Sequence, residues 1–250
     1  MKRSPCTQAA LAIALALMAT SASAQQPAPV PAVDPAAIKA LEGMSAYLRN
    51  LKSFQVVAVT TTDDVAENGQ SIQSSGKTTI VARMPDRLFA DVSSDKQERR
   101  YLYDGKNFTL WARRAKFYAT VPAPPTLAQL DDVLQEKYDM EIPLADLFRF
   151  GGPKWSAADI RAASVIGPSG VDGVSCIHYA FRQEDVDFQV WIQRGDHPLP
   201  RKLVIVTTSD PERPQHSATY DWNLAPSFDD SIFTFTPPEG AGKVVLAVAK

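Results

Sequence analysis

Three histidines have the clearest capacity for chemistry in this sequence: His178, His197 and His216, separated by 19 residues in each interval. If they converged in the fold with Asp185 or Asp221, they could bind a metal ion or activate a nucleophile such as Ser217. Spacing of this kind has no local structural mechanism, however, and His197 lies in a proline-rich turn. We therefore predict that the histidines form neither a catalytic site nor a metal site.

Other catalytic signatures are missing from the 250 residues. There is no His-Glu-x-x-His pair, no glycine-rich phosphate loop and no nucleophile elbow of the Gly-x-Ser-x-Gly type. The formal net charge of −2 gives no basic footprint for nucleic acid. The sequence predicts a protein that is not an enzyme, needs no cofactor and binds no nucleic acid.

The N-terminus has the pattern of a cleavable signal peptide over residues 1–24. Lys2 and Arg3 precede an apolar run from Ala9 to Ala19, and Ala22-Ser23-Ala24 provides a cleavage site. The apolar run is shorter than the roughly 20 residues that a spanning helix needs. We expect export to the periplasm as a soluble monomer.

Removal of the signal peptide also removes Cys6 and leaves Cys176 as the only cysteine. An intramolecular disulfide is then impossible, so core packing must hold the fold together. A single cysteine in a strand is usually a small buried apolar residue. We expect the Cys176 thiol to be unreactive in the folded protein.

The remaining chain is predicted to be a short tether followed by one domain. Residues 25–33 are rich in proline and alanine and indicate an extended tether. A helix is predicted from Asp34 to about Leu51, where apolar residues recur at helical spacing. A single amphipathic helix must lie against another apolar surface, so residues 34–250 are expected to form one domain.

Strands dominate the rest of the sequence. The clearest are three successive strands between Cys176 and Thr207, each with one alternating apolar face. Similar alternation predicts strands at residues 54–62, 74–84, 87–92, 97–103, 107–112, 117–121, 163–171, 216–222 and 232–236, with residues 244–248 as a further edge strand or tail. The fold class is therefore mainly β with some helix (α+β), an antiparallel sheet or incomplete barrel of about eleven strands, and the family resemblance given below implies that it is a strongly curved half-barrel covered by a few helices.

Helical patterns interrupt the strands between residues 122 and 164. Thr126 and Gln129 form a capping box, and a second short segment, residues 144–150, is apolar around most of its circumference. Pro143 and Gly151-Gly152 provide breaks at its two ends. We expect residues 144–150 to form a movable lid over the open sheet.

Several sequence stretches resemble a family of predicted periplasmic proteins known as a domain of unknown function. They are YDGKNFTLW, APPTLAQLDD, PLADLF, DGVSCIHYAF, DFQVWI, PLPRKLVI and FTFTPPEGA. That family looks like a relative of the LolA and LolB outer-membrane lipoprotein carriers and of the periplasmic stress sensor RseB. The resemblance implies a half-barrel closed by helices, and an arginine latch for the lid would fall on Arg83 or Arg87.

A curved sheet with an apolar inner face must be filled by helices, by ligand or by both. We predict that a ligand would contact aromatic and lid residues: Leu144, Leu147, Phe148, Trp111, Tyr179, Phe181, Phe188 and Trp191. The resemblance implies a carrier for an apolar ligand such as a lipid or an acyl chain, working with a membrane or lipoprotein partner. The alternatives are an envelope sensor of the RseB type or a hydrolase on the same scaffold.

Overall fold

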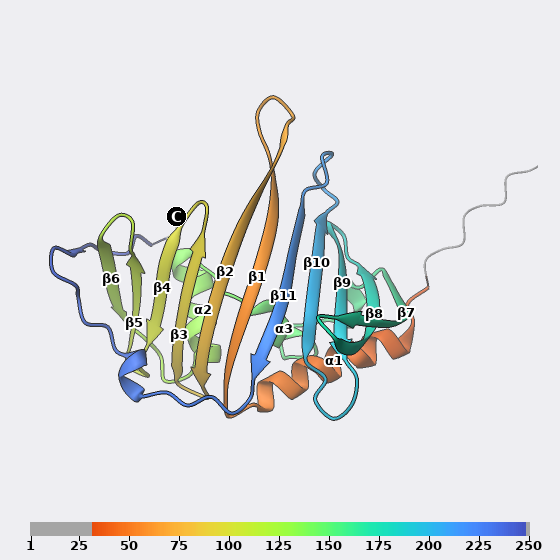
Figure 1. Cartoon of the computed structure of the whole chain (residues 1–250), viewed down its shortest axis with the longest axis horizontal. Helices are drawn as coiled ribbons and strands as arrows, with labels where there is room; N and C mark the ends of the chain where they lie inside the picture. Colours follow the sequence, from red (N-terminus) through yellow and green to blue (C-terminus); the bar gives the residue numbers. More distant parts are fainter. Residues whose placement is uncertain (1–31, 249–250) are drawn as a thin grey trace, which may run out of the picture. The chain divides into compact units, whose positions relative to one another are not determined.

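Twelve strands form one sheet in the part of the chain that the computed structural model describes, residues 32–248. The strand order is β12-β6-β5-β4-β3-β2-β1-β11-β10-β9-β8-β7 (Figure 1). Neighbouring strands are antiparallel except for β12, which is parallel to β6. The predicted signal peptide and most of the predicted tether lie outside the described residues.

The element bounds follow the predicted pattern closely. The strands are β1 (Ser53–Val65), β2 (Ser71–Arg83), β3 (Arg87–Ser94), β4 (Glu98–Tyr103), β5 (Asn107–Ala112), β6 (Phe117–Pro122), β7 (Ala162–Val171), β8 (Val174–Arg182), β9 (Val186–Gln193), β10 (Pro200–Thr207), β11 (Gln215–Asn223) and β12 (Gly242–Lys243). The helices are α1 (Pro35–Asn50), α2 (Leu127–Tyr138) and α3 (Asp146–Arg149), with the short 3-10 helices η1 (Ala157–Asp159) and η2 (Asp230–Phe233). The predicted fold class, a mainly β curved antiparallel sheet with few helices, is confirmed.

The two faces of the sheet have different roles. Helix α1 packs on the inner face through a stripe of buried residues at helical spacing, including Leu41, Met44 and Leu48. Asp34 caps this helix by accepting a hydrogen bond from the Ala36 N–H at 2.8 Å. The helices therefore cover the apolar side chains on only one face of the sheet. No helix between residues 32 and 248 is long and apolar enough to span a membrane.

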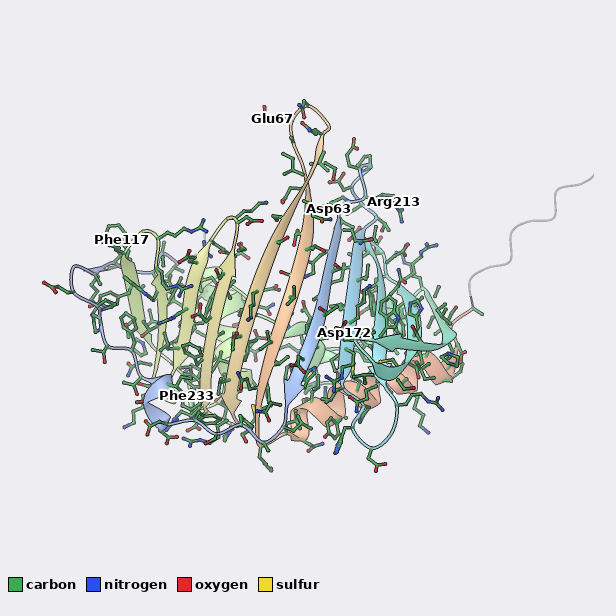
Figure 2. The ribbon with its side chains drawn as sticks, in the orientation of Figure 1. Asp63, Glu67, Phe117, Asp172, Arg213 and Phe233 are labelled. Atoms are coloured by element: carbon green, nitrogen blue, oxygen red, sulfur yellow. The ribbon has the colours of Figure 1, made fainter. Side chains whose placement is uncertain are left out.

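The strand predicted at residues 232–236 is wrong. The chain instead forms η2, because Asp229 caps it by accepting a hydrogen bond from the Ser231 N–H at 2.8 Å. Phe233, labelled in Figure 2, is then buried. The guanidinium carbon of Arg83 lies 5.8 Å from the centre of its ring. The final strand pairing occurs later, at β12, two residues before the predicted edge strand begins at Val244.

The C-terminal segment covers part of the outer face. After β11 the chain crosses to the far edge of the sheet, where β12 pairs with β6 (Figure 1). On the way, the Phe235 ring packs against two rings on the outer face. Its centre lies 5.0 Å from that of Tyr118 and 5.9 Å from that of Trp111. Trp111 is therefore buried by the C-terminal segment and not by the helices of the inner face.

Candidate functional site

A cavity of about 520 Å³ lies between the inner face of β1–β3 and the helical segment that follows β6. Phe54 and Val56 of β1 face Ala82 and Ile80 of β2, and Ala82 in turn faces Leu88 of β3. These side chains form an apolar floor, in which the small Ala82 leaves space above the sheet. Strand pairing places these apolar residues of three strands in one row, so the wall that the sheet contributes to the cavity is apolar.

The cover of the cavity comes from α2 and from residues 142–149. Thr126 caps α2 by accepting a hydrogen bond from the Gln129 N–H at 3.3 Å, as the capping box predicts. The Leu127 N–H donates to the Pro85 carbonyl at 2.8 Å, which fixes the start of α2 over the turn between β2 and β3. Phe148 stacks on Phe54 at 5.8 Å between ring centres. Cover and floor thus meet through an aromatic contact.

Helix α1 holds the covering segment through polar contacts to its backbone. Nη1 of Arg49 donates to the carbonyls of Phe148 and Phe150, both at 2.7 Å. The Ser45 hydroxyl donates to the Leu147 carbonyl at 2.5 Å. These contacts satisfy carbonyls at the end of α3 that have no partner within the helix.

Arg83 and Arg87, the latch candidates implied by the resemblance, have other partners. Arg83 forms two hydrogen bonds to the Asp230 carboxylate, at 2.6 and 2.9 Å. Arg87 pairs with Asp86 at 2.7 Å. The arginine that contacts the segment of residues 144–150 is therefore Arg49, which lies in a helix and not in a strand.

The ends of the covering segment adopt left-handed backbone conformations. Leu144 has a φ of 67° and Gly151 a φ of 66°. For a leucine this conformation costs about 1–2 kcal/mol, so surrounding contacts must maintain it. A Cβ on Gly151 would also lie 3.1 Å from Glu42 Cγ, so glycine suits this position. Left-handed backbone thus occurs directly after Pro143 and at Gly151, where the sequence predicts breaks.

Charged side chains line the rim of the cavity. Arg149 pairs with Asp131 of α2 at 2.9 Å, and Lys154 pairs with Asp132 at 2.6 Å. The hydrogen bond from Lys154 to Asp132 raises the pKa of Lys154. The first ion pair joins α2 to α3, and the second joins α2 to the chain that follows α3.

The structure brings only two of the eight predicted ligand contacts to this cavity, Leu144 and Phe148. Leu147 is buried beneath α1. Phe181 and Phe188 stack on each other at 4.8 Å in the core of β8 and β9. Tyr179 borders a smaller depression next to α1.

The two predicted tryptophans lie on the outer face. Trp111 packs against Phe235, and Trp191 stacks on His178 with ring centres 3.9 Å apart. Lys202 lies 5.0 Å from the Trp191 ring, and the indole N–H donates to Ser169 at 3.2 Å. Because alternate residues of a strand point to opposite faces of the sheet, the two tryptophans lie on the face away from the cavity. That any of the six residues outside the cavity contacts a ligand stays a prediction.

The main floor residues were not among the predicted contacts. The sequence shows that these residues belong to the apolar faces of their strands, but not that they lie next to one another. They are Phe54, Val56, Ile80, Ala82 and Leu88. The hairpin between β1 and β2 could have indicated part of the floor, because its register pairs Phe54 with Ala82 and Val56 with Ile80. The position of α2 above them could not be obtained from that register.

The three histidines have separate partners. His178 contacts Gln189 at 3.0 Å, His197 contacts the Tyr47 hydroxyl at 2.6 Å, and His216 contacts the Thr62 hydroxyl at 2.8 Å. Burial lowers the pKa of both His178 and His216, which favours the neutral imidazole. Among residues 32–248, no group of three or more His, Cys, Asp or Glu side chains is arranged to hold a metal ion.

Cys176 is fully buried, and burial raises the pKa of its thiol. Since the thiolate is the reactive form, we expect a chain carrying Cys6→Ser to react slowly with a thiol reagent when native. The same chain should react at the rate of a free thiol in denaturant. Labelling followed by mass spectrometry measures both rates, and equally fast labelling of the native chain would contradict the expected protection.

The fold and cavity define a class of β-rich proteins in which a curved antiparallel sheet and a helical cover enclose an apolar space. Within that class, the chain belongs to the family of predicted periplasmic proteins DUF2092, whose model matches residues 37–247. None of the curated protein sequences matches the chain.

Solved structures with a similar arrangement have low sequence identity to this chain. LprF from Mycobacterium bovis is 14% identical with a TM-score of 0.46, over 84% of this chain and 99% of that one. An uncharacterized conserved protein from Thermus thermophilus is 8% identical with a TM-score of 0.48, over 84% of this chain and 99% of that one. The LolA superfamily protein NE2245 from Nitrosomonas europaea is 13% identical with a TM-score of 0.37, over 80% of this chain and 97% of that one.

Proposed function

We propose that this chain is a non-enzymatic periplasmic carrier or binding protein for an apolar ligand, a lipid or the acyl chains of a lipoprotein. The observation that supports the proposal is the cavity of about 520 Å³, whose floor and cover are apolar. Its size is within the range of about 300–1,000 Å³ that is typical of small-molecule sites. The charged residues of its lining include two ion pairs, Arg149 with Asp131 and Lys154 with Asp132.

Burial of apolar surface would supply the affinity. Each methylene group transferred from water into the cavity contributes about 0.8 kcal/mol, so even a partly inserted acyl chain gains useful binding energy. Phe54, Ile80 and Leu88 would contact the chain from the sheet, and Leu144 and Phe148 from the cover. No polar reaction step is required for this role.

The covering segment would have to move for a ligand to enter. Residues 144–151 are bounded by the left-handed Leu144 and Gly151, and are attached to α1 by hydrogen bonds from Arg49 and Ser45. Exchange of contacts with the floor for contacts with a ligand needs only a small free-energy difference between two packed states. We therefore assign residues 144–151 the role of lid.

Extraction of the purified protein with organic solvent tests the proposal directly. The protein should be isolated from the periplasm without detergent, and the extract analysed by mass spectrometry. We expect a lipid or acyl compound in near-stoichiometric amount, and an apolar fluorescent dye should bind to the extracted protein in competition with that lipid. Absence of both the co-purified lipid and dye binding would reject the carrier function.

A further inference from the structure

Exposed apolar side chains gather where β6 pairs with β12. Among residues 32–248, nine large apolar residues are exposed, and three of them lie in the paired segments or directly after them: Phe117 (50%), Val244 (43%) and Val245 (93%). Figure 2 shows Phe117 at the start of β6, towards one side of the sheet. Contiguous exposed apolar residues on a soluble domain commonly mark an interaction surface.

Backbone pairing holds these residues in position. The Gly242 N–H donates to the Lys116 carbonyl at 2.9 Å, and the Val244 N–H donates to the Tyr118 carbonyl at 2.8 Å. A Cβ on Gly242 would lie 2.7 Å from the Phe117 ring, so that ring packs directly against the glycine backbone. Phe117 and Val244 are thus exposed on paired strands and not on an unattached tail.

Three cations lie in or directly beside these strands and β4. Arg99, Lys116 and Lys243 are exposed and form no ion pair among the described residues. Strand register places Arg99 opposite Ala112, Ala112 opposite Phe117, and Phe117 opposite Gly242, in one row across four strands. We call Arg99, Lys116, Phe117, Lys243, Val244 and Val245 the β6–β12 corner.

The acidic groups near the corner are mostly neutralised. Glu98 pairs with Arg114 at 3.3 Å and with Arg113 at 3.6 Å, and Glu239 precedes β12 as an exposed carboxylate. Three cations against this one carboxylate give the corner a positive charge, although the whole chain has a formal net charge of −2. This local positive charge favours attraction of the corner to an anionic surface.

We propose that the β6–β12 corner docks on an anionic phospholipid surface. An exposed aromatic ring and aliphatic side chains flanked by lysine and arginine suit the boundary between lipid headgroups and acyl chains. The cations contact the headgroups, while Phe117, Val244 and Val245 enter the apolar layer beneath them. This inference rests on the corner and not on the cavity, so it stands independently of the proposed carrier function.

Sedimentation with lipid vesicles tests the docking. The purified chain should pellet with vesicles of an equal mixture of phosphatidylglycerol and phosphatidylcholine, but not with phosphatidylcholine alone, and added salt should weaken the binding. The variant Lys116→Gln/Lys243→Gln should bind the mixed vesicles about 30-fold more weakly, because each cation near such a surface contributes a factor of about five to six. Phe117→Ser/Val245→Ser should also reduce binding.

Matched variants separate docking from general effects. Lys39→Gln/Lys106→Gln removes two exposed lysines elsewhere and leaves the same net charge as the corner variant. Val59→Ser changes a residue that is 54% exposed and lies in the central strand β1. Both should bind the mixed vesicles like the unchanged chain, with dye binding to the cavity unaltered in all variants. Equal binding to both kinds of vesicle, or an equal loss in the control variants, would overturn the proposal.

Discussion

Replacement of Ala82 by Phe is expected to abolish binding of an apolar dye while the domain stays folded. Ala82 lies on the cavity floor between Phe54 and Leu88, where an added ring would project into the open space. We expect the dye affinity to fall at least about tenfold, because the ring takes the volume and apolar surface that the dye would use. Fluorescence titration gives the affinity, and thermal unfolding gives the stability.

Ala90→Phe provides the matched control for that variant. Ala90 is a fully buried residue of the same sheet face but does not border the cavity. An added ring there has no open space, so the substitution should destabilise the fold by about 1–3 kcal/mol or more. If Ala82→Phe instead destabilised the protein as much as Ala90→Phe, or left dye affinity unchanged, the cavity would not be the ligand site.

Replacement of Arg49 by Met is expected to release the lid. The substitution removes both hydrogen bonds to the Phe148 and Phe150 carbonyls, and hydrogen bonds from charged donors contribute about 1.5–3 kcal/mol each. Because the methionine keeps most of the apolar stem of the side chain, packing of α1 should survive. Chymotrypsin should then cut faster after Phe148 and Phe150, and the dye should enter the cavity more rapidly.

Arg83→Met is the control for the general effect of replacing a hydrogen-bonded arginine by methionine. Arg83 bonds to Asp230, whose side chain is 65% exposed, so loss of this solvent-exposed ion pair should change the stability little. Its partner lies in η2, away from the lid. Equal acceleration of cleavage in Arg83→Met and Arg49→Met would mean that Arg49 does not hold residues 144–151 in place.

Local patterns in the sequence determined the elements of this protein. Period-two alternation located β8, β9 and β10, and the Asp34 and Thr126 caps located the starts of α1 and α2. These features depend on residues close together in the chain, since a strand or helix buries its apolar face according to its own periodicity. The exception was residues 232–236, where alternation predicted a strand but the Asp229 cap and burial of Phe233 stabilised η2.

Only the tertiary structure decided which apolar faces enclose open space. The aromatic residues of β8 and β9 stack on one another and fill their part of the core, whereas Ala82 and its neighbours leave a cavity beneath α2. Trp111 has the alternation of an ordinary strand residue, but the returning C-terminal segment covers it on the outer face. Arg49 reaches the lid carbonyls across about 100 residues of sequence, as its 99-residue separation from Phe148 shows. Sequence periodicity specifies which side of an element is apolar; the packing of distant segments specifies what that side contacts.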